Sequence, residues 1–97
     1  MRVIKRPTLE TFWEKHRRAE EPLKAWFHEA KLAEWRSPND IKERYRSADF
    51  LADNRVVFDI GGNNFRLVVK IAYQPGIVYI RFVGTHAEYD KIDAETV

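Results

Sequence analysis

The spacing of apolar residues changes once along this chain of 97 residues, near Arg55. Before that point apolar residues recur every three or four positions, the spacing that places side chains on one face of a helix. After it they alternate with other residues, as in a strand with one buried face. The pattern predicts one α+β domain over residues 1–97, with helices in its first half packed on one face of an antiparallel sheet.

The first half is predicted to contain a short strand followed by helices. "MRVIK" can form the strand, and Thr8 is expected to cap a helix that starts near Leu9. Pro22 suits the first turn of a second helix, and Ser37 is expected to start a third that runs to about Tyr45. The first two helices should form a hairpin, with apolar stripes of Leu9, Phe12, Trp13 and His16, and of Leu23, Trp26, Phe27, Ala30 and Ala33.

Three strands follow, "RVVFDI", "NFRLVVKIAY" and "IVYIRFV", separated by "GGNN" and "QPG". A turn at Gly62 and Asn63 sets the first hairpin, and a four-residue "QPGI" loop is expected to set the second. In the third strand Val78, Ile80 and Phe82 are then expected on the core face. The expected pairs on the other face are Asp59 with Arg66, Arg55 with Lys70, Lys70 with Arg81, and Arg66 with Thr85.

The sheet face away from the core is predicted to gather Arg66, Lys70, Tyr79 and Arg81. Like charges across a strand pair repel each other, so Lys70 beside Arg81 favours an anion between them, such as phosphate. Arginine guanidinium groups match phosphate oxygens, which supports an RNA- or phosphate-binding face. The alternative is an ordinary solvated face on which Asp59 neutralises Arg66.

The segment "GTHAEYD" is expected to form a short helix directly after the third strand. Thr85 and Glu88 have the spacing of a capping box. His86, Tyr89 and Asp90 are then three and four positions apart and share one face. The helix should emerge at the rim of the basic face, where proton-transfer groups would meet phosphate-binding cations.

This combination suits the cleavage of RNA, which carries its own nucleophile, the 2′-hydroxyl. His86 is a candidate base or acid, and Tyr89 a proton donor, or a base if Arg81 lowers its pKa. Arg66 and Arg81 would stabilise the negative charge of the transition state. Asp90 is expected either to orient His86 or only to cap the helix.

Three alternatives stay open from the residues alone. His86, Glu88 and Asp90 could bind a metal, although Glu88 projects away from the other two on a helix. The domain could also bind RNA, or a protein partner and DNA, without chemistry. No cofactor is expected, and the lack of cysteine excludes thiolate chemistry. No apolar run approaches membrane-spanning length, so a soluble cytoplasmic protein without membrane contact is expected.

The segments "NRVVFDIGGNNFRLVVKIAY" and "VYIRFVGTHAEYDKID", with "LAEWRSPNDIKERYRSADFL" upstream, resemble the HigB-type toxins of bacterial toxin–antitoxin systems, in the RelE superfamily. The resemblance implies a RelE-like fold and metal-independent cleavage of translated mRNA on the ribosome. It also implies a HigA-type helix-turn-helix antitoxin, whose complex with the toxin binds operator DNA. Carried over by position, the functional residues are Arg66, Arg81, His86, Tyr89 and Asp90.

Overall fold

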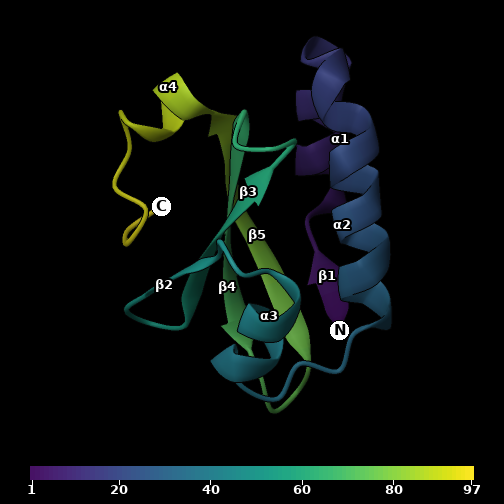
Figure 1. Ribbon diagram of the computed structural model, residues 1–97, viewed down its shortest axis with the longest axis vertical. Helices are drawn as coiled ribbons and strands as arrows, with labels where there is room; N and C mark the ends of the chain where they lie inside the picture. The colour runs from purple at the N-terminus through teal and green to yellow at the C-terminus, as the bar shows by residue number, and fades with distance from the viewer.

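A five-stranded sheet with strand order β1-β5-β4-β3-β2 forms the centre of the computed structural model, which describes all residues 1–97. Two helices, α1 and α2, cover one face of the sheet, whereas α4 and the last residues lie on the other side (Figure 1). The predicted α+β class, the helical hairpin on one sheet face and the short final helix are confirmed. The elements are β1 (Arg2–Ile4), α1 (Arg6–Lys15), the 3₁₀ turn η1 (Arg17–Ala19), α2 (Glu20–Leu32), α3 (Pro38–Arg44), β2 (Asp49–Leu51), β3 (Arg55–Ile60), β4 (Phe65–Ala72), β5 (Ile77–Thr85) and α4 (His86–Tyr89).

The sheet extends beyond the predicted meander at both edges. β1 pairs with β5 in parallel, and β2 pairs with β3 in an antiparallel hairpin. β2 lies between the third helix and the three predicted strands, where no strand was predicted. The β2–β3 turn contains Asp53 and Asn54 with φ of 61° and 58°. Asp and Asn tolerate this left-handed conformation better than most residues, and two such residues in succession suit a tight hairpin.

The first helix begins earlier than predicted. α1 starts at Arg6, and Lys5 before it has φ of 75°, so the chain turns directly out of β1. The backbone N–H of Thr8 donates to the Lys5 carbonyl at 3.0 Å, which places Thr8 inside the first turn. The predicted cap at Thr8 is therefore wrong. Ser37 does precede α3 as predicted, and Pro22 does lie in the first turn of α2.

The core fills the space between the sheet and the helices. Phe58 of β3 lies at its centre, edge-on to Trp26 of α2 with ring centroids 5.4 Å apart. Trp35 and Tyr45 also contact Phe58, at 6.1 and 5.1 Å. Trp26 and Phe58 are almost fully buried. The helix aromatics are thus core residues, which leaves the opposite sheet face for other contacts.

The first long hairpin has the predicted register. Ile60 pairs with Phe65, Asp59 with Arg66, and Arg55 with Lys70. The connecting turn begins with Gly61 and Gly62, with φ of 63° and 62°. Such angles are strained for side chains with a Cβ atom, so glycine is needed there.

The second long hairpin departs from the prediction. Its loop lies one residue earlier, so Ala72 pairs with Ile77 and Lys70 with Tyr79. A β-bulge then interrupts the ladder beside Val68 and Val69, and Arg66 pairs with Gly84. The predicted pairs of Lys70 with Arg81 and of Arg66 with Thr85 are therefore wrong.

The bulge also exchanges the two faces of β5. Ile80 pairs with Val69 and Phe82 with Val68, so Arg81 is the extra residue of the bulge. Phe82 was predicted on the core face but lies on the outer face, and Val83 lies on the core face instead. A register shift of one residue moves every later side chain to the other face, which explains the error.

Candidate active site

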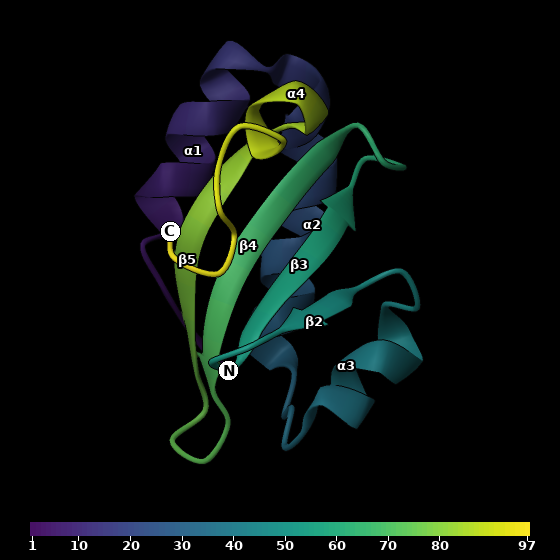
Figure 2. The same cartoon turned by 90° about the vertical axis from the view of Figure 1, so that its left-hand side faces the viewer.

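The short helix α4 is fixed to the end of β5 by its cap. The backbone N–H of Glu88 donates to Thr85 Oγ1 at 3.1 Å, and the backbone N–H of Thr85 donates to Glu88 Oε1 at 2.8 Å. This is the predicted capping box. The cap holds α4, which carries His86 and Tyr89, on the side of the sheet away from α1 and α2 (Figure 2).

Arg66 lies next to this helix, on β4. Its Nη1 is 2.8 Å from Asp59 Oδ1, and only 13% of its side chain is exposed. The two groups are close enough for an ion pair, but Nη1 is buried and its hydrogens are not aligned for a hydrogen bond. The guanidinium carbon is 5.9 Å from the centre of the Tyr89 ring. Asp59 therefore positions a largely desolvated cation that retains free hydrogen-bonding capacity.

Tyr89 is half-buried between α4 and the sheet. Burial raises the pKa of its hydroxyl, and the negative charge of Asp49 adds to the rise, while Arg66 opposes it. A raised pKa keeps the phenol protonated at neutral pH, so Tyr89 can donate a proton. The alternative of Tyr89 as a base with a pKa lowered by Arg81 is not supported, because the shift is upward and Arg66 is the cation that opposes it.

His86 and Asp90 form the remaining part of the cluster. The distance between His86 Nδ1 and Asp90 Oδ2 is 3.4 Å, and both side chains are at least half exposed. Asp90 is also the residue that caps the C-terminal end of α4. Asp90 is therefore the C-cap residue of α4 and lies beside His86, and its role in orienting His86 stays a prediction. Together Arg66, His86, Tyr89 and Asp90, with Asp59 behind Arg66, are named the rim cluster.

The other predicted site residues form a separate group. Lys70 lies four positions from Arg66 on β4, which is roughly 13 Å along an extended strand. Its Nζ is 2.8 Å from Asp53 Oδ2, and Tyr79 lies opposite it on β5. Arg81 Nε donates to the main-chain oxygen of Val97, the last residue of the sequence, at 3.1 Å. Lys70, Tyr79 and Arg81 are named the lower basic group.

Two residues near these groups were not identified as site candidates. Asp49, which raises the pKa of Tyr89, belongs to the unpredicted strand β2; the adjacent Asp–Asn turn was the available signal. Arg55 was predicted only as the partner of Lys70. Arg55 is only 6% exposed. Its side chain contacts residues 94 and 97, and no sequence pattern predicted that these residues lie beside it.

The largest hollow in the surface and the candidate metal ligands do not form a second site with the rim cluster. The largest hollow, about 670 Å³, contains none of the predicted site residues and is lined by Phe27, Trp35 and Tyr73 among others. Glu88, part of the metal alternative, caps α4. The structure groups no three His, Asp or Glu side chains in a metal-binding arrangement. No helix combines the length and the apolar character required to span a membrane.

Comparison with known proteins identifies the family of this chain. Residues 19–92 match the family model of HigB_toxin, described as the RelE-like toxic component of a toxin–antitoxin system. The chain is 30% identical over 96 residues to the mRNA interferase toxin HigB of Escherichia coli K12, covering 97% of this chain and 92% of that protein. It is 26% identical over 94 residues to the mRNA interferase HigB of E. coli O6:H1, covering 95% and 91%. The chain belongs to the HigB family of RelE-like toxins.

Proposed function

We propose that this protein is a toxin that cleaves mRNA as an endoribonuclease, with the rim cluster as its active site. The names of its relatives support the reaction class. The observation that carries the assignment to these residues is the position of Arg66, a desolvated guanidinium beside the raised-pKa phenol of Tyr89. The His86–Asp90 pair is part of the same short helix.

The proposed reaction uses the RNA 2′-hydroxyl as its nucleophile. His86 accepts the proton of this hydroxyl as its oxygen forms a bond to the adjacent phosphorus. The bond between phosphorus and the 5′-oxygen breaks, and Tyr89 donates its proton to that oxygen. The products are a 2′,3′-cyclic phosphate and a 5′-hydroxyl end. Arg66 stabilises the charge on the phosphorane oxygens, Asp59 positions Arg66, and Asp90 orients His86.

The cellular setting forms part of the same proposal and is supported by family membership. The substrate is mRNA on the ribosome, and the toxin acts in the cytoplasm without a cofactor. A HigA-type helix-turn-helix antitoxin neutralises it, and operator DNA is bound only through that complex. Cleavage arrests translation and growth.

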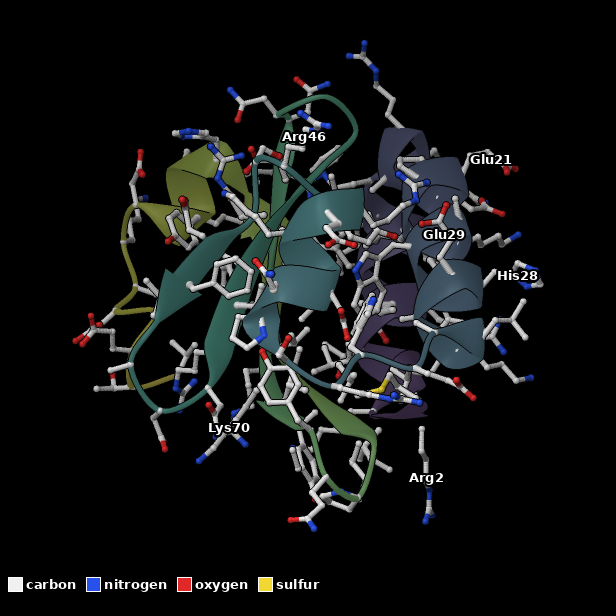
Figure 3. The ribbon with its side chains drawn as sticks, turned by 60° about the horizontal axis from the view of Figure 1, so that its bottom comes forward. Arg2, Glu21, His28, Glu29, Arg46 and Lys70 are labelled. Carbon is white, nitrogen blue, oxygen red and sulfur yellow. The ribbon has the colours of Figure 1, made fainter.

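The competing function is a binding module in which the Asp59–Arg66 ion pair is only a surface contact. The two are separated by inducing the protein in bacteria and mapping new RNA 5′ ends. The His86→Ala/Tyr89→Phe variant tests the cluster. His28→Ala is a matched control, because His28 projects outward from α2 (Figure 3).

The proposed function predicts growth arrest and new 5′-hydroxyl ends inside coding regions for the unaltered protein and the His28→Ala control. Both effects should disappear in the double variant while it stays folded. Normal growth without new ends, from folded unaltered protein, would support the binding module. Cleavage that persists in the double variant would place the chemistry outside the rim cluster.

A further inference from the structure

Two hollows meet at the C-terminal end of α2, at the opposite end of the molecule from α4 (Figure 1). They have volumes of about 670 and 380 Å³, and they are continuous because Ala33 and Trp35 line both. Phe27 and Tyr73 are half-buried in the wall of the larger one. Leu32, in the wall of the smaller one, is 68% exposed. The two hollows together are named the α2-end groove.

The α2-end groove carries positive charge that the protein itself does not neutralise. The charged side chains lining the larger hollow are three cations and one carboxylate, Arg2, Lys31, Arg36 and Glu34. None of these four takes part in an ion pair. In the smaller hollow Glu29 and Arg44 already pair with each other. The C-terminal end of α2 adds only about half a negative charge, so the cations remain in excess.

The walls of the groove suit a protein segment better than RNA. Half of the residues that line the larger hollow are hydrophobic. Bases bind single-strand-binding proteins by stacking on accessible aromatic faces. Here Trp35 is only 6% exposed, and the guanidinium of Arg6 lies 4.7 Å from the centre of the Phe27 ring. An apolar floor with a charged rim is instead the usual composition of a protein–protein interface.

We propose that the α2-end groove binds a segment of the antitoxin that carries acidic side chains and a bulky apolar side chain. The acidic side chains pair with Arg2, Lys31 and Arg36, and the apolar side chain enters the larger hollow and covers Leu32. The family of this chain is the toxic component of a toxin–antitoxin system, which makes the antitoxin the protein partner. The proposal rests on the function proposed above and adds a docking surface to it.

The groove is far enough from the rim cluster for the two to be tested separately. Gln74 and Gly76 line the groove just before β5, and His86 follows the end of β5. β5 has nine residues, so the two sites lie roughly 25 Å apart along the strand. This distance exceeds the Debye length of about 8 Å at physiological ionic strength. Reversing a charge in the groove should therefore leave the rim cluster unaffected.

The first test measures how the purified cognate HigA-type antitoxin binds to the His86→Ala/Tyr89→Phe protein and to its groove variants. Arg36→Glu should weaken binding by roughly 10–100-fold, mainly through slower association, and should reduce its salt dependence. Arg18→Glu is the matched control, because Arg18 is also exposed and unpaired but precedes α2 at its other end. Leu32→Ala should also weaken binding, and its exposure spares the fold. Equal affinities of Arg36→Glu and Arg18→Glu would overturn the proposal.

The second test locates the bound antitoxin by NMR of the ¹⁵N-labelled His86→Ala/Tyr89→Phe protein. The indole Nε1–H resonance of Trp35 should shift when antitoxin is added, whereas that of Trp13, which lines neither hollow, should not. Shifts confined to α4 would place the antitoxin at the rim cluster and overturn the groove. A Trp35 shift that depends on the concentration of the toxin alone would assign the groove to a second copy of this chain.

The chemistry of the segment is tested with overlapping peptides that cover the antitoxin sequence. Peptides that shift the Trp35 resonance should contain Asp or Glu close to a Leu, Ile, Phe or Trp. Shifts caused only by peptides without acidic residues would overturn the proposed charge complementarity.

Growth of bacteria separates this proposal from the proposed function. Expressed alone, the unaltered protein, Arg36→Glu and Arg18→Glu should all arrest growth. The co-expressed antitoxin should restore growth with the unaltered protein and Arg18→Glu, but not with Arg36→Glu. Restoration with all three would overturn the groove. No arrest by any of them would contradict the proposed function, and the binding measurements would then decide the groove.

Discussion

Arg66 shows how one ion pair can be both structural and functional. Asp59 holds the guanidinium at 2.8 Å, but the poor alignment leaves hydrogen-bond donors unsatisfied in a site that is only 13% exposed. In such a site a developing negative charge is stabilised more strongly than in water, because few solvent dipoles must reorganise. The sequence left two alternatives for the outer face: that Asp59 neutralises Arg66, or that the face binds an anion. The two are therefore compatible.

Replacing Arg66 with alanine should remove most of the activity and leave the protein folded. We expect mRNA cleavage to fall by roughly 10²–10³-fold, the usual effect of losing one donor to a transition-state oxyanion. Asp59 is only 24% exposed and loses its partner, so the free energy of unfolding should fall by roughly 1–3 kcal/mol. Primer extension on translated mRNA and urea unfolding measure the two effects.

Asp59→Asn provides the comparison for that experiment. It keeps the shape of the partner but removes its charge, so Arg66 should be less firmly positioned and cleavage should fall by a smaller factor than in Arg66→Ala. If Arg66→Ala unfolds, its role is structural. If Asp59→Asn loses as much cleavage as Arg66→Ala, Asp59 does more than position the arginine.

Tyr89 should titrate above the ordinary tyrosine pKa of 10.0, because burial and nearby carboxylates disfavour the phenolate. Its proton is then retained at neutral pH and lost only as pH rises through the elevated value. NMR titration of labelled tyrosine ring carbons measures this, with Tyr89→Phe identifying the resonance. A Tyr89 pKa at or below 10.0 would contradict the upward shift.

At the scale of elements, the β5 bulge determines how the outer face is composed. It places Phe82 beside Gly84 on the outer face and leaves Arg81 free of the ladder. A Cβ atom added at Gly84 would lie 2.5 Å from Phe82 Cζ and 3.2 Å from Glu88 Cβ. The absence of a side chain at Gly84 therefore allows the Phe82 ring and α4 to lie close together.

Gly84→Ala should disturb α4 more than the core. Overpacking costs about 1–3 kcal/mol in typical cases, and here the displaced atoms belong to Phe82 and to the helix that carries His86 and Tyr89. We expect a lower thermal midpoint together with a loss of cleavage. Gly62→Ala is the comparison for backbone strain alone, because a Cβ there meets nothing within 4 Å but the φ of 62° is strained for alanine; it should lower the thermal midpoint without a comparable loss of cleavage.

The double variant Gly84→Ala/Phe82→Ala decides the cause. Removing the ring should restore part of the cleavage lost in Gly84→Ala if the clash with Phe82 is responsible. If the double variant is no more active, the clash with Glu88 of α4 is the dominant effect. Unchanged cleavage in Gly84→Ala would show that α4 adapts without cost.

The sequence predicted the elements whose patterns are local. The β3–β4 register followed from alternation and its turn, and the α4 cap followed from Thr85 and Glu88. The β4–β5 register was not predictable from alternation, because one extra residue at Arg81 reverses the faces without altering composition. Likewise, the spacing of His86, Tyr89 and Asp90 in the rim cluster is local. The burial of Arg55, in contrast, depends on Ala94 and Val97, which lie 39 and 42 positions further along the chain.

At the scale of the whole molecule, the sheet separates stability from chemistry. The aromatic core lies between the sheet and the helices on one side, and α4 and the last residues of the chain lie on the other side (Figure 1). Substitutions on the outer side can therefore change function without removing core contacts. Polar contacts between elements also contribute to the stability of the fold. Several of them involve carboxylates whose pKa is altered, so their contribution depends on pH.

Three of these carboxylates have a pKa below its ordinary value. The hydrogen bond that the Tyr45 hydroxyl donates joins the end of α3 to Glu29 of α2, and it lowers the pKa of Glu29. Lys70 lowers the pKa of Asp53, and a backbone N–H at the α4 cap lowers that of Glu88. A lowered folded-state pKa contributes stability that is present above the unfolded-state pKa and is lost as pH falls through the folded-state pKa.

The protein should therefore lose stability as pH falls below the ordinary carboxyl pKa values of 3.8 and 4.5. Thermal unfolding at pH 5 and pH 3 measures this loss, and starting at pH 5 leaves most ordinary imidazole titration outside the interval. The Glu29→Gln/Asp53→Asn variant should have a lower thermal midpoint than the unaltered protein at pH 5. Its midpoint should fall by less than that of the unaltered protein between pH 5 and pH 3. Equal midpoints of the unaltered protein at both pH values would contradict the prediction. A variant with the same pH dependence as its parent would show that other carboxylates are responsible.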